Sequence, residues 1–462
     1  MTRLDAPAAF APRAPRPRAA PAGTLTQLLL LARNPLELWT ERHFEEPILI
    51  GRGVTGARFV TVSDPAAIRR VFVDNAANYE KDALQLRVLS AGSPADAGAG
   101  LLVARGDLWK RTRRTLAPLF APRRVGAFAP VMRDRCERRV DNWLRRKARA
   151  VAIDVEMTEL TYDILSATLF SDALAGDADG VARELAALLD SIGRVHPFDA
   201  LAAPAWAPRF GRGRAKAARA WFSTAIDRLI DERRAAIAAG RSAPADILTA
   251  LIEAQDPESG AGLTPQEVAA NLFTLIAAGH ETTARALAWT LHLLARAPDW
   301  QERCAQEALG LGDDPSLWLD AAPTIRASFE ESMRLFPPVP FMSRASQGPD
   351  RLCGVDIGPG VLVVVAPWVV HRHRLLWERP ETFDPARFLP GARESIDRFA
   401  YLPFGAGPRI CIGMSFAMQE AVVALVAMLR RARFAPIGDE PEVVHRITLK
   451  PARTLRLAVS PR

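Results

Sequence analysis

The stretch 404-FGAGPRICIG-413 places one cysteine, Cys411, in a loop that contains three glycines and a proline. An apolar run that is typical of a helix follows directly from Met414. Glycines allow backbone amides or a flat ligand to come close to the sulfur. The dipole and free N–H groups at the start of a helix favour a thiolate. The loop therefore predicts a ligand-binding sulfur, although a small buried cysteine is the commoner case.

The composition indicates a globular protein with free thiols. Hydrophobic residues make up 49% of the 462 residues, enough for a large core. The four cysteines lack metal-finger spacing and are typical of a reducing compartment. The net charge of +8 fits a solvated basic surface, nucleic acid, a membrane face or an acidic protein partner. Because no lysine-rich block or aromatic–basic interleaving occurs, we expect no binding to nucleic acid.

The N-terminal segment is expected to be a leader outside the folded domain. Residues 1–23 are rich in proline, alanine and arginine, a composition that predicts disorder. The run from Leu28 to Leu31 is too short for a transmembrane anchor, which needs about 20 apolar residues. No secretory cleavage site accompanies it. We therefore expect a cytoplasmic protein without a transmembrane anchor.

The pattern of apolar residues predicts a mainly α fold with a small β portion. From about Asp107 to Phe336 the apolar positions recur with a helical period. Residues 351–370 change to strand character around a Gly-Pro-Gly turn. A last helix is expected from about Met414 to Arg431. Since no linker divides the rest of the chain, residues 24–462 are predicted to form one large domain.

Shorter segments complete this picture. Two strands are expected at 45–53 and 57–65, followed by a helix that Asp64 caps. The Gly/Ala/Ser-rich segment 90–100 predicts a mobile loop, and the prolines of 195–208 predict a loop between helices.

A second polar motif, 277-AAGHETT-283, interrupts a long apolar run that is expected to be a buried helix. Burial of a carboxylate such as Glu281 is costly unless it is paired or solvated. Threonine side chains inside a helix can bond back to the preceding turn and bend it. Gly279 removes a side chain at the same point. The motif predicts a groove over something small and polar, against the alternative of a helix with one polar stripe.

Two further motifs are less specific alone. Glu331 and Arg334 lie three residues apart on a predicted helix, so they share a face and can pair. The prolines that follow predict the end of that helix. Arg387 could join the pair from a later proline-rich segment. Trp109 and Arg113 are four residues apart and face one side of another helix.

These motifs, in this order and spacing, resemble those of the cytochrome P-450 family of haem-thiolate monooxygenases. The resemblance extends from about residue 40, and the loop 404–413 matches the family's haem-binding loop at every expected position. It implies a single large domain of the cytochrome P-450 type and haem b as cofactor, with Cys411 as the axial ligand and only metal ligand of the iron. A thiolate ligand donates electron density to iron and favours cleavage of the O–O bond.

The resemblance implies roles for further residues. Phe404 would pack beside the sulfur, Arg409 would bind a haem propionate, and Glu331, Arg334 and Arg387 would form a structural triad without a catalytic role. The residues expected to bind the cofactor are Trp109, Arg113, Ala278, Gly279, Arg344, Phe404, Arg409, Cys411 and Gly413.

The same resemblance assigns catalysis to the polar motif. Glu281 and Thr282 would activate oxygen, with the threonine hydroxyl directing protons to bound dioxygen. Ala278 and Gly279 would leave room for dioxygen beside the iron. His280 would point elsewhere on the helix and is expected to be structural.

The expected reaction inserts one oxygen atom from dioxygen into a C–H bond or a double bond of a lipophilic small molecule. The implied pocket positions, at 85–102, 195–208, Phe273, Ala277 and 339–341, are nearly all apolar. Because the chain ends soon after the last helix, electrons are expected from a separate ferredoxin or flavodoxin with its reductase. The protein is expected to be a monomer.

The basic charge and the class of enzyme leave alternatives open. Lys110, Arg111 and Arg114 are expected on the outer side of their helix, where they would attract an acidic redox partner or act as ordinary solvated charges. A peroxide-using or isomerising haem-thiolate enzyme is an alternative, although such members commonly lose the pair that Glu281 and Thr282 retain. A non-catalytic haem sensor would not need the polar groove.

Overall fold

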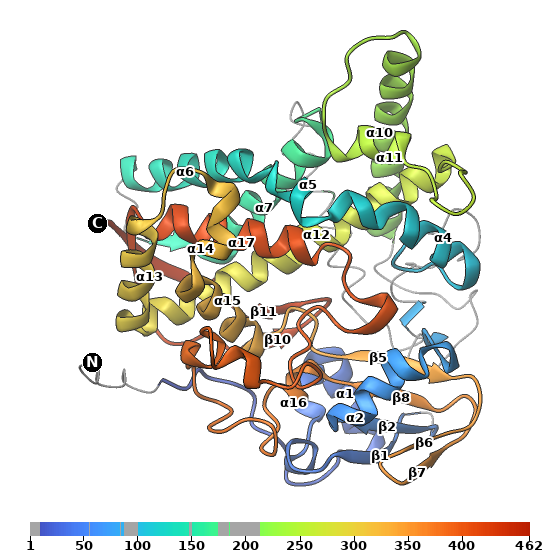
Figure 1. Cartoon of the computed structure of the whole chain (residues 1–462). Helices are drawn as coiled ribbons and strands as arrows, with labels where there is room; N and C mark the ends of the chain where they lie inside the picture. Colours follow the sequence, from blue (N-terminus) through green and yellow to red (C-terminus); the bar gives the residue numbers. More distant parts are fainter. Residues whose placement is uncertain are drawn as a thin grey trace.

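The computed structural model describes residues 10–54, 56–83, 85–86, 100–146, 150–173, 184 and 213–462. Within them, helices form most of the molecule and strands gather in one smaller region (Figure 1). The predicted mainly α fold with a small β portion is therefore confirmed. The predicted loops at 90–100 and 195–208 lie outside the described residues, apart from Gly100.

The helices differ widely in length. Their bounds are α1 Thr24–Arg33, α2 Pro65–Arg69, α4 Gly106–Leu116, α5 Pro122–Gly126, α6 Ala129–Arg145, α7 Ile153–Phe170, α10 Gly213–Ala238, α11 Ile247–Glu253, α12 Pro265–Arg296, α13 Pro298–Gly310, α14 Trp318–Ala321, α15 Pro323–Leu335, α16 Pro367–Val370 and α17 Met414–Leu429.

The strands are all short. Their bounds are β1 Ile48–Arg52, β2 Arg58–Val62, β3 Tyr79–Glu80, β4 Val151–Ala152, β5 Met342–Ser346, β6 Asp350–Leu352, β7 Val355–Ile357, β8 Leu362–Val365, β9 Ala432–Pro436, β10 Val443–His445, β11 Leu449–Pro451 and β12 Arg456–Pro461.

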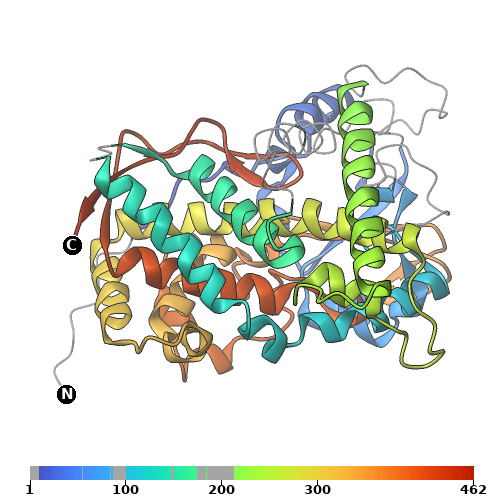
Figure 2. The same cartoon turned by 90° about the horizontal axis from the view of Figure 1, so that it is seen from above.

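The longest described helix, α12, crosses the molecule from one side to the other (Figure 2). Its start is fixed by a capping box: Thr264 Oγ1 accepts from the Glu267 N–H at 3.2 Å, and the Glu267 carboxylate accepts from the Thr264 N–H at 2.9 Å. Pro265 occupies the first position, where its missing N–H costs nothing. The helix packs against α7, α10, α15 and α17, so its apolar residues form the centre of the core.

The largest sheet joins two distant parts of the chain. Its strand order is β1-β2-β8-β5-β3, with β1 and β2 antiparallel and β8 parallel to β2. The predicted strands at 45–53 and 57–65 are therefore confirmed. The helix cap is confirmed as well, because Asp64 Oδ1 accepts from the Ala67 N–H at 2.7 Å. A separate apolar cluster, which includes Val60 and Val363, packs under this sheet.

The N-terminal segment differs from its prediction where the structure describes it. Phe10 forms a β-bridge with Phe383 and packs against the main core. The Arg18 N–H donates to the Trp39 carbonyl at 2.9 Å, and the Arg18 carbonyl accepts from Glu41 at 3.0 Å. Residues 10–22 are therefore held against the domain. The composition could not reveal these contacts, because backbone groups form the bonds.

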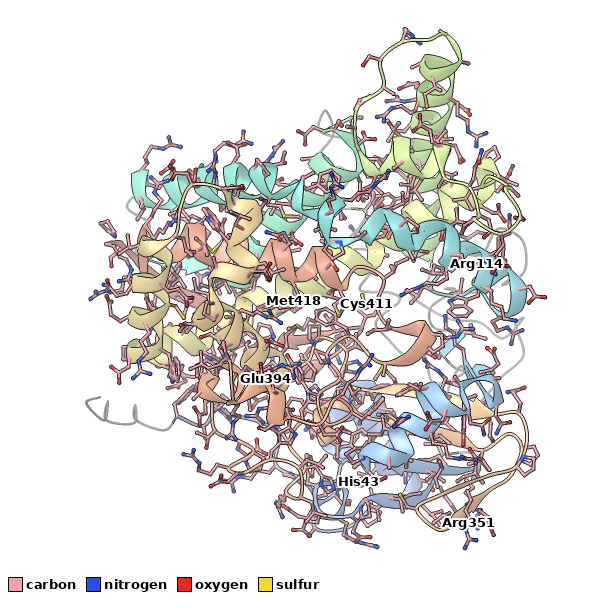
Figure 3. The ribbon with its side chains drawn as sticks, in the orientation of Figure 1. His43, Arg114, Arg351, Glu394, Cys411 and Met418 are labelled. Carbon is pink, nitrogen blue, oxygen red and sulfur yellow. The ribbon has the colours of Figure 1, made fainter. Side chains whose placement is uncertain are left out.

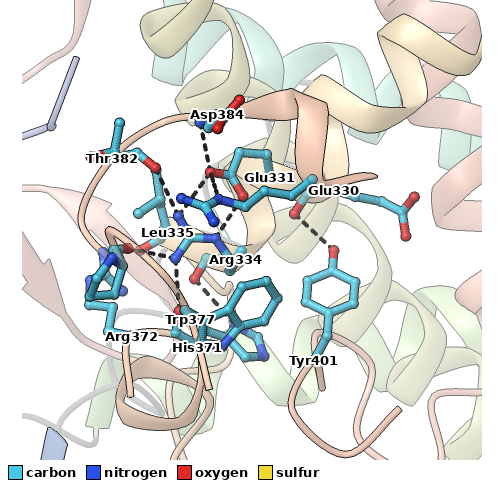
Figure 4. A network of polar contacts seen from close by, with 12 residues as sticks. Glu330, Glu331, Arg334, Leu335, His371, Arg372, Trp377, Thr382, Asp384 and Tyr401 are labelled. Atoms are coloured by element: carbon cyan, nitrogen blue, oxygen red, sulfur yellow. Dashed lines mark hydrogen bonds and ion pairs between the residues drawn. The ribbon is translucent and has the colours of Figure 1, made fainter. Parts of the chain in front are cut away.

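A buried arginine organises the irregular segment between α16 and α17 (Figure 4). Arg334 and Glu331 are both fully buried and pair at 2.6 Å, as the sequence predicts. The Arg334 guanidinium also donates to the carbonyls of His371, Pro380 and Thr382 at 2.6–3.0 Å. Arg387 lies 3.6 Å from Glu331, which confirms it as the third member. The helix α15 therefore holds a segment that has almost no regular structure of its own.

His371 extends this network toward the cysteine loop, and sequence reasoning missed it. Its Nδ1 lies 3.2 Å from the Arg334 carbonyl, and the Leu402 N–H donates to its Nε2 at 2.7 Å. A carbonyl only accepts and an N–H only donates, so His371 is neutral with its proton on Nδ1. Burial lowers the pKa of His371 to about 3, which agrees with this form.

Replacement of Arg334 by alanine should prevent stable folding. Removal of one partner from a buried ion pair costs about 3–5 kcal/mol, compared with a net stability of about 5–15 kcal/mol for a domain. Arg326 is a matched control on the same helix, since its guanidinium is 44% exposed and pairs with Glu330 at 3.4 Å. Arg326→Ala should cost about 0–1 kcal/mol. Thermal unfolding measures both, and a normal melting temperature for Arg334→Ala would contradict the prediction.

Candidate functional site

The cysteine loop lies in the middle of the molecule, immediately before α17 (Figure 3). Its turn is closed by the Cys411 N–H, which donates to the Phe404 carbonyl at 2.9 Å. Gly405 and Gly407 have φ angles of 73° and 70°, in the left-handed region that favours glycine. Although it lies among the helices, the Cys411 side chain is exposed. The loop therefore presents an accessible sulfur inside the fold.

Gly407 fixes the position of this loop against the N-terminal half of the chain. A Cβ at this position would lie 1.8 Å from the carbonyl oxygen of Phe72, closer than any real contact. Only glycine permits the two backbones to approach in this way. The loop is therefore supported on one side by Phe72 and on the other by the network of Arg334 and His371.

The thiol of Cys411 is not ionised by its protein surroundings. Although one face of the side chain is accessible, the protein packed around the sulfur desolvates it and raises its pKa. The Gly413 N–H and the charge of Arg113 act in the opposite direction, so the start of α17 favours a thiolate as the sequence predicts, but desolvation is the stronger effect. A bound metal cation would deprotonate the sulfur.

The predicted residues of α4 meet the cysteine loop. Arg113 Nη1 donates to the Ile410 carbonyl at 2.8 Å, next to the cysteine. The Arg409 guanidinium stacks over the Trp109 ring, 4.2 Å from its centroid. The structure thus brings Trp109, Arg113, Arg409 and Cys411 together, as the sequence predicts.

A group of cations lies beside Arg409. Arg344 and Lys81 are buried or half-buried, and each has its pKa lowered, first by desolvation and then by the charge of Arg409. The pKa of Lys81 falls to about 7 and that of Arg344 to about 10. Glu80 and Asp82 balance the charges of the two arginines, and a lysine with a pKa of about 7 carries only part of a charge at neutral pH. The guanidinium groups still offer donors to a ligand with carboxylates; no sequence signal pointed to Lys81.

The polar motif of α12 leaves one strip of this buried helix accessible. Ala278 is exposed and Thr282 is partly exposed, whereas the neighbouring Thr283 is buried. Thr282 Oγ1 donates back to the Ala278 carbonyl at 2.8 Å, which confirms the predicted local bond. A Cβ at Gly279 would lie 3.4 Å from Leu165 of α7, an ordinary van der Waals contact, so packing against α7 does not by itself require glycine here.

Glu281 and Thr282 are not brought together. Glu281 Oε1 accepts from Thr448 Oγ1 at 2.9 Å and lies 3.5 Å from Arg285, while Oε2 has no partner among the described residues. Adjacent residues on a helix point about 100° apart, which explains the separation. His280 is buried in the core, in agreement with a structural role.

The predicted cationic surface of α4 is mostly neutralised. Arg111 forms an ion pair with Glu267, and Arg114 pairs with Asp256 at 3.0 Å and with Glu258 at 2.8 Å. These two arginines therefore join α4 to the start of α12 and to the segment before it, instead of forming a free patch. The sequence could not show these ion pairs, because the partners are distant in the chain; Lys110 is 61% exposed and pairs only with Asp107 of its own helix among the described residues.

Comparison with known proteins decides the family. The family model of cytochrome P-450 matches residues 41–457. The chain belongs to the cytochrome P-450 family. Enzymes of this family are oxidoreductases that bind haem through a cysteine thiolate, and they require dioxygen, a substrate and a source of electrons.

Several curated relatives and a solved structure support this assignment. Cyclooctatin synthase of Streptomyces melanosporofaciens is 34% identical over 76% of this chain and 77% of its own. Human cytochrome P-450 4F12 is 31% identical over 87% of this chain and 80% of its own. Mouse leukotriene-B4 omega-hydroxylase 3 is 30% identical over 87% of this chain and 81% of its own. The fold matches the crystal structure of a cytochrome P-450 haem domain with a TM-score of 0.81 over 97% of this chain and 99% of that one, at 24% identity.

The residues present fit a haem of this family. Cys411 supplies an accessible sulfur, and Arg344 and Arg409 supply cations for the haem carboxylates. No group of three or more His, Cys, Asp or Glu side chains in the described parts could hold a metal by itself. In the same parts, no helix combines the length and apolar character needed to cross a bilayer.

Replacement of Gly407 by alanine should abolish haem binding, because the new methyl group would meet the Phe72 carbonyl at 1.8 Å and displace the loop. Gly438 is a matched control: it has the same φ of 70°, but nothing lies within 4 Å of a Cβ there. Gly438→Ala should cost only the conformational strain of about 1–2 kcal/mol. Haem absorbance per mole of protein compares the variants, and equal haem content would contradict the prediction.

Proposed function

We propose that this protein is a monooxygenase that transfers one oxygen atom from dioxygen to a lipophilic small molecule, by hydroxylation or epoxidation. The observation that carries the proposal is the position of Cys411: an accessible sulfur in a glycine loop, with Arg113 and Arg409 at its side. Electrons would come from a separate ferredoxin or flavodoxin and its reductase. We further propose that the protein is a cytoplasmic monomer.

The proposed roles follow from the contacts of each side chain. Cys411 would bind the iron of haem b, and the cations of Arg344 and Arg409 would hold its carboxylates beside Trp109. When bound, haem supplies the redox chemistry that activates dioxygen. The carbonyl of Phe404, which accepts from the Cys411 N–H, would keep the sulfur in one orientation.

Thr282 is proposed to hold a proton close to bound dioxygen. Its hydroxyl lies on the accessible strip of α12 and donates to the Ala278 carbonyl at 2.8 Å, so rotation of the side chain would release that proton. Glu281 would supply protons to Thr282 through its Oε2, which has no hydrogen-bond partner among the described residues. To do so, the Glu281 carboxylate would have to break its hydrogen bond with Thr448 and its ion pair with Arg285.

A lipophilic substrate is supported by the apolar residues near the site. Phe273 and Ala277 are partly exposed on α12, and Val339 and Phe341 precede β5. The mouse relative is named leukotriene-B4 omega-hydroxylase 3, and an omega-hydroxylation of this kind is one reaction that the site could perform. A fatty acid, terpenoid or aromatic compound would suit such a lining.

A peroxide-using enzyme is the second candidate, and the position of Glu281 favours it. The carboxylate is bonded to Thr448 and is not held beside the Thr282 hydroxyl. An enzyme supplied with peroxide needs no proton path from that acid. Product formed from reductant and dioxygen, compared with product formed from peroxide alone, separates the two candidates.

Replacement of Cys411 by alanine should remove the strongly red-shifted Soret band of the reduced carbon monoxide complex, because that band requires a thiolate ligand. Haem retention should also fall. Cys304→Ala is the control, since that thiol is fully buried and bonds to Ser328 at 3.3 Å. A normal carbon monoxide spectrum for Cys411→Ala would refute the ligand assignment.

Replacement of Thr282 by alanine should leave haem binding intact but divert reducing equivalents to hydrogen peroxide. Proton delivery by a positioned group contributes about 100- to 10,000-fold to a rate. The measurement is product formed per reductant consumed. Product formed by the same variant with added peroxide is the internal control and should fall much less. Unchanged coupling would remove Thr282 from the proton path.

A further inference from the structure

The turn formed by residues 100–104, just before α4, lies against α12. A Cβ at Gly100 would lie 2.1 Å from Thr274 Oγ1 and 2.4 Å from the carbonyl oxygen of Ala270. Both distances are shorter than any real contact, and the Ala270 carbonyl is backbone that cannot rotate away. Gly100 has no positive φ, so the close approach to α12, and not the shape of the turn, requires glycine.

Asn271 of α12 holds the same turn by a buried hydrogen bond. Its side-chain Oδ1 accepts from the Leu101 N–H at 2.9 Å, and its Nδ2 donates to the Glu267 carbonyl at 2.8 Å. Asn271 is 0% exposed. Because an N–H only donates and a carbonyl only accepts, the orientation of the amide is fixed. The turn therefore has one defined position on α12.

The turn is closed on itself, so its two ends move together. The Gly100 carbonyl accepts from the N–H groups of Val103 and Ala104, both at 3.0 Å. Ala104 is only 1% exposed. A displacement of Gly100 on α12 would therefore carry Ala104 with it.

The other side of the turn faces the arginine of the cysteine loop. Arg409 Nη1 donates to the Ala104 carbonyl at 3.3 Å, and Lys81 Nζ donates to the Leu102 carbonyl. Glu80 accepts from Arg409 Nη2 at 3.4 Å. A guanidinium offers five N–H donors, so donors remain for a carboxylate ligand after these two bonds.

We infer that Gly100 and Asn271 are positioning residues for Arg409. They fix the turn 100–104 on α12, and the Ala104 carbonyl then fixes the guanidinium that is proposed to hold a haem carboxylate. The inference rests on that proposed role of Arg409. Neither Gly100 nor Asn271 needs to contact the haem for this effect.

The geometry of arginine makes its exact orientation important. A guanidinium binds a carboxylate best through two parallel N–H groups, which requires a specific orientation of its plane. The Ala104 carbonyl accepts from one edge of this plane, and the Trp109 ring lies 4.2 Å from the guanidinium carbon on one face. If the turn moved away, the plane would be held less narrowly, and the bond to the carboxylate would weaken.

Haem release from the holoprotein into an excess of haem-free myoglobin tests this inference. Arg409→Gln should release haem at least about tenfold faster, because a hydrogen bond to a charged group is lost. Asn271→Leu should release haem about two- to tenfold faster, because Arg409 is less well held. The double variant Asn271→Leu/Arg409→Gln should be no faster than Arg409→Gln, since both changes act on one contact.

Gln301 of α13 provides a matched control for Asn271. It is a buried amide, 3% exposed, that donates to the carbonyls of Leu294 and Phe434 at 3.1 and 2.8 Å. Any effect of Gln301→Leu on haem release should multiply with that of Arg409→Gln. The same multiplication for Asn271→Leu would overturn the inference and leave the proposed role of Arg409 intact. A wild-type release rate for Arg409→Gln alone would refute that role, and the inference with it.

A spectroscopic measurement tests the path without reference to haem release. The propionate bending bands of the resonance Raman spectrum report hydrogen bonds to the haem carboxylates, so they should shift in Gly100→Ala and in Asn271→Leu. Gly310→Ala is the control, because nothing lies within 4 Å of a Cβ there. If the leucine or alanine variant retains no haem, Asn271→Ser gives the same comparison with a polar side chain in place. Unchanged bands in an Asn271 variant that releases haem faster would overturn the inference.

Discussion

The buried guanidinium of Arg334 is the contact on which the candidate site depends. Residues between α16 and α17 form little regular structure, so their carbonyls have few partners of their own. Arg334 satisfies three of these carbonyls while its charge is balanced by Glu331. His371 then transmits the same support to Leu402, just before the cysteine loop. The segment between α16 and α17 is therefore held in one position, although it has little regular structure, and it supports the loop of Cys411.

The other part of the candidate site is α12, a helix whose hydrogen bonding is weakened locally at its polar motif. On α12, two neighbouring threonine hydroxyls compete with the backbone for carbonyls, on a helix that forms the centre of the core. Bonds to this turn from outside the helix come from Thr448, which donates to Glu281, and from Thr161, which donates to the His280 carbonyl. The structure therefore combines a firmly held cysteine loop with a helical turn whose threonine hydroxyls bond back to its own carbonyls.

Local features of the sequence predicted more than distant ones. The loop around Cys411 was predictable because glycine positions and the following helix are encoded within a few residues. The Glu331–Arg334 pair was predictable from helical spacing. The partners of Arg111 and Arg114 were not, since they lie 156 and 142 residues away. The leader was misjudged for a similar reason: composition does not show that Phe10 reaches Phe383.

The contact of Gly407 with Phe72 also constrains the order in which the molecule can assemble. Two backbones far apart in the chain meet there, and in the sheet the strand at 58–62 pairs with the strand at 362–365. Closing loops of this length is slow, since much chain entropy is lost before the contacts form. Helices such as α6 and α7 pack against each other from neighbouring parts of the chain, whereas the ligand loop reaches its final place only when the segment of Phe72 lies against it. The haem site is therefore expected to form late in folding, after the local helical contacts.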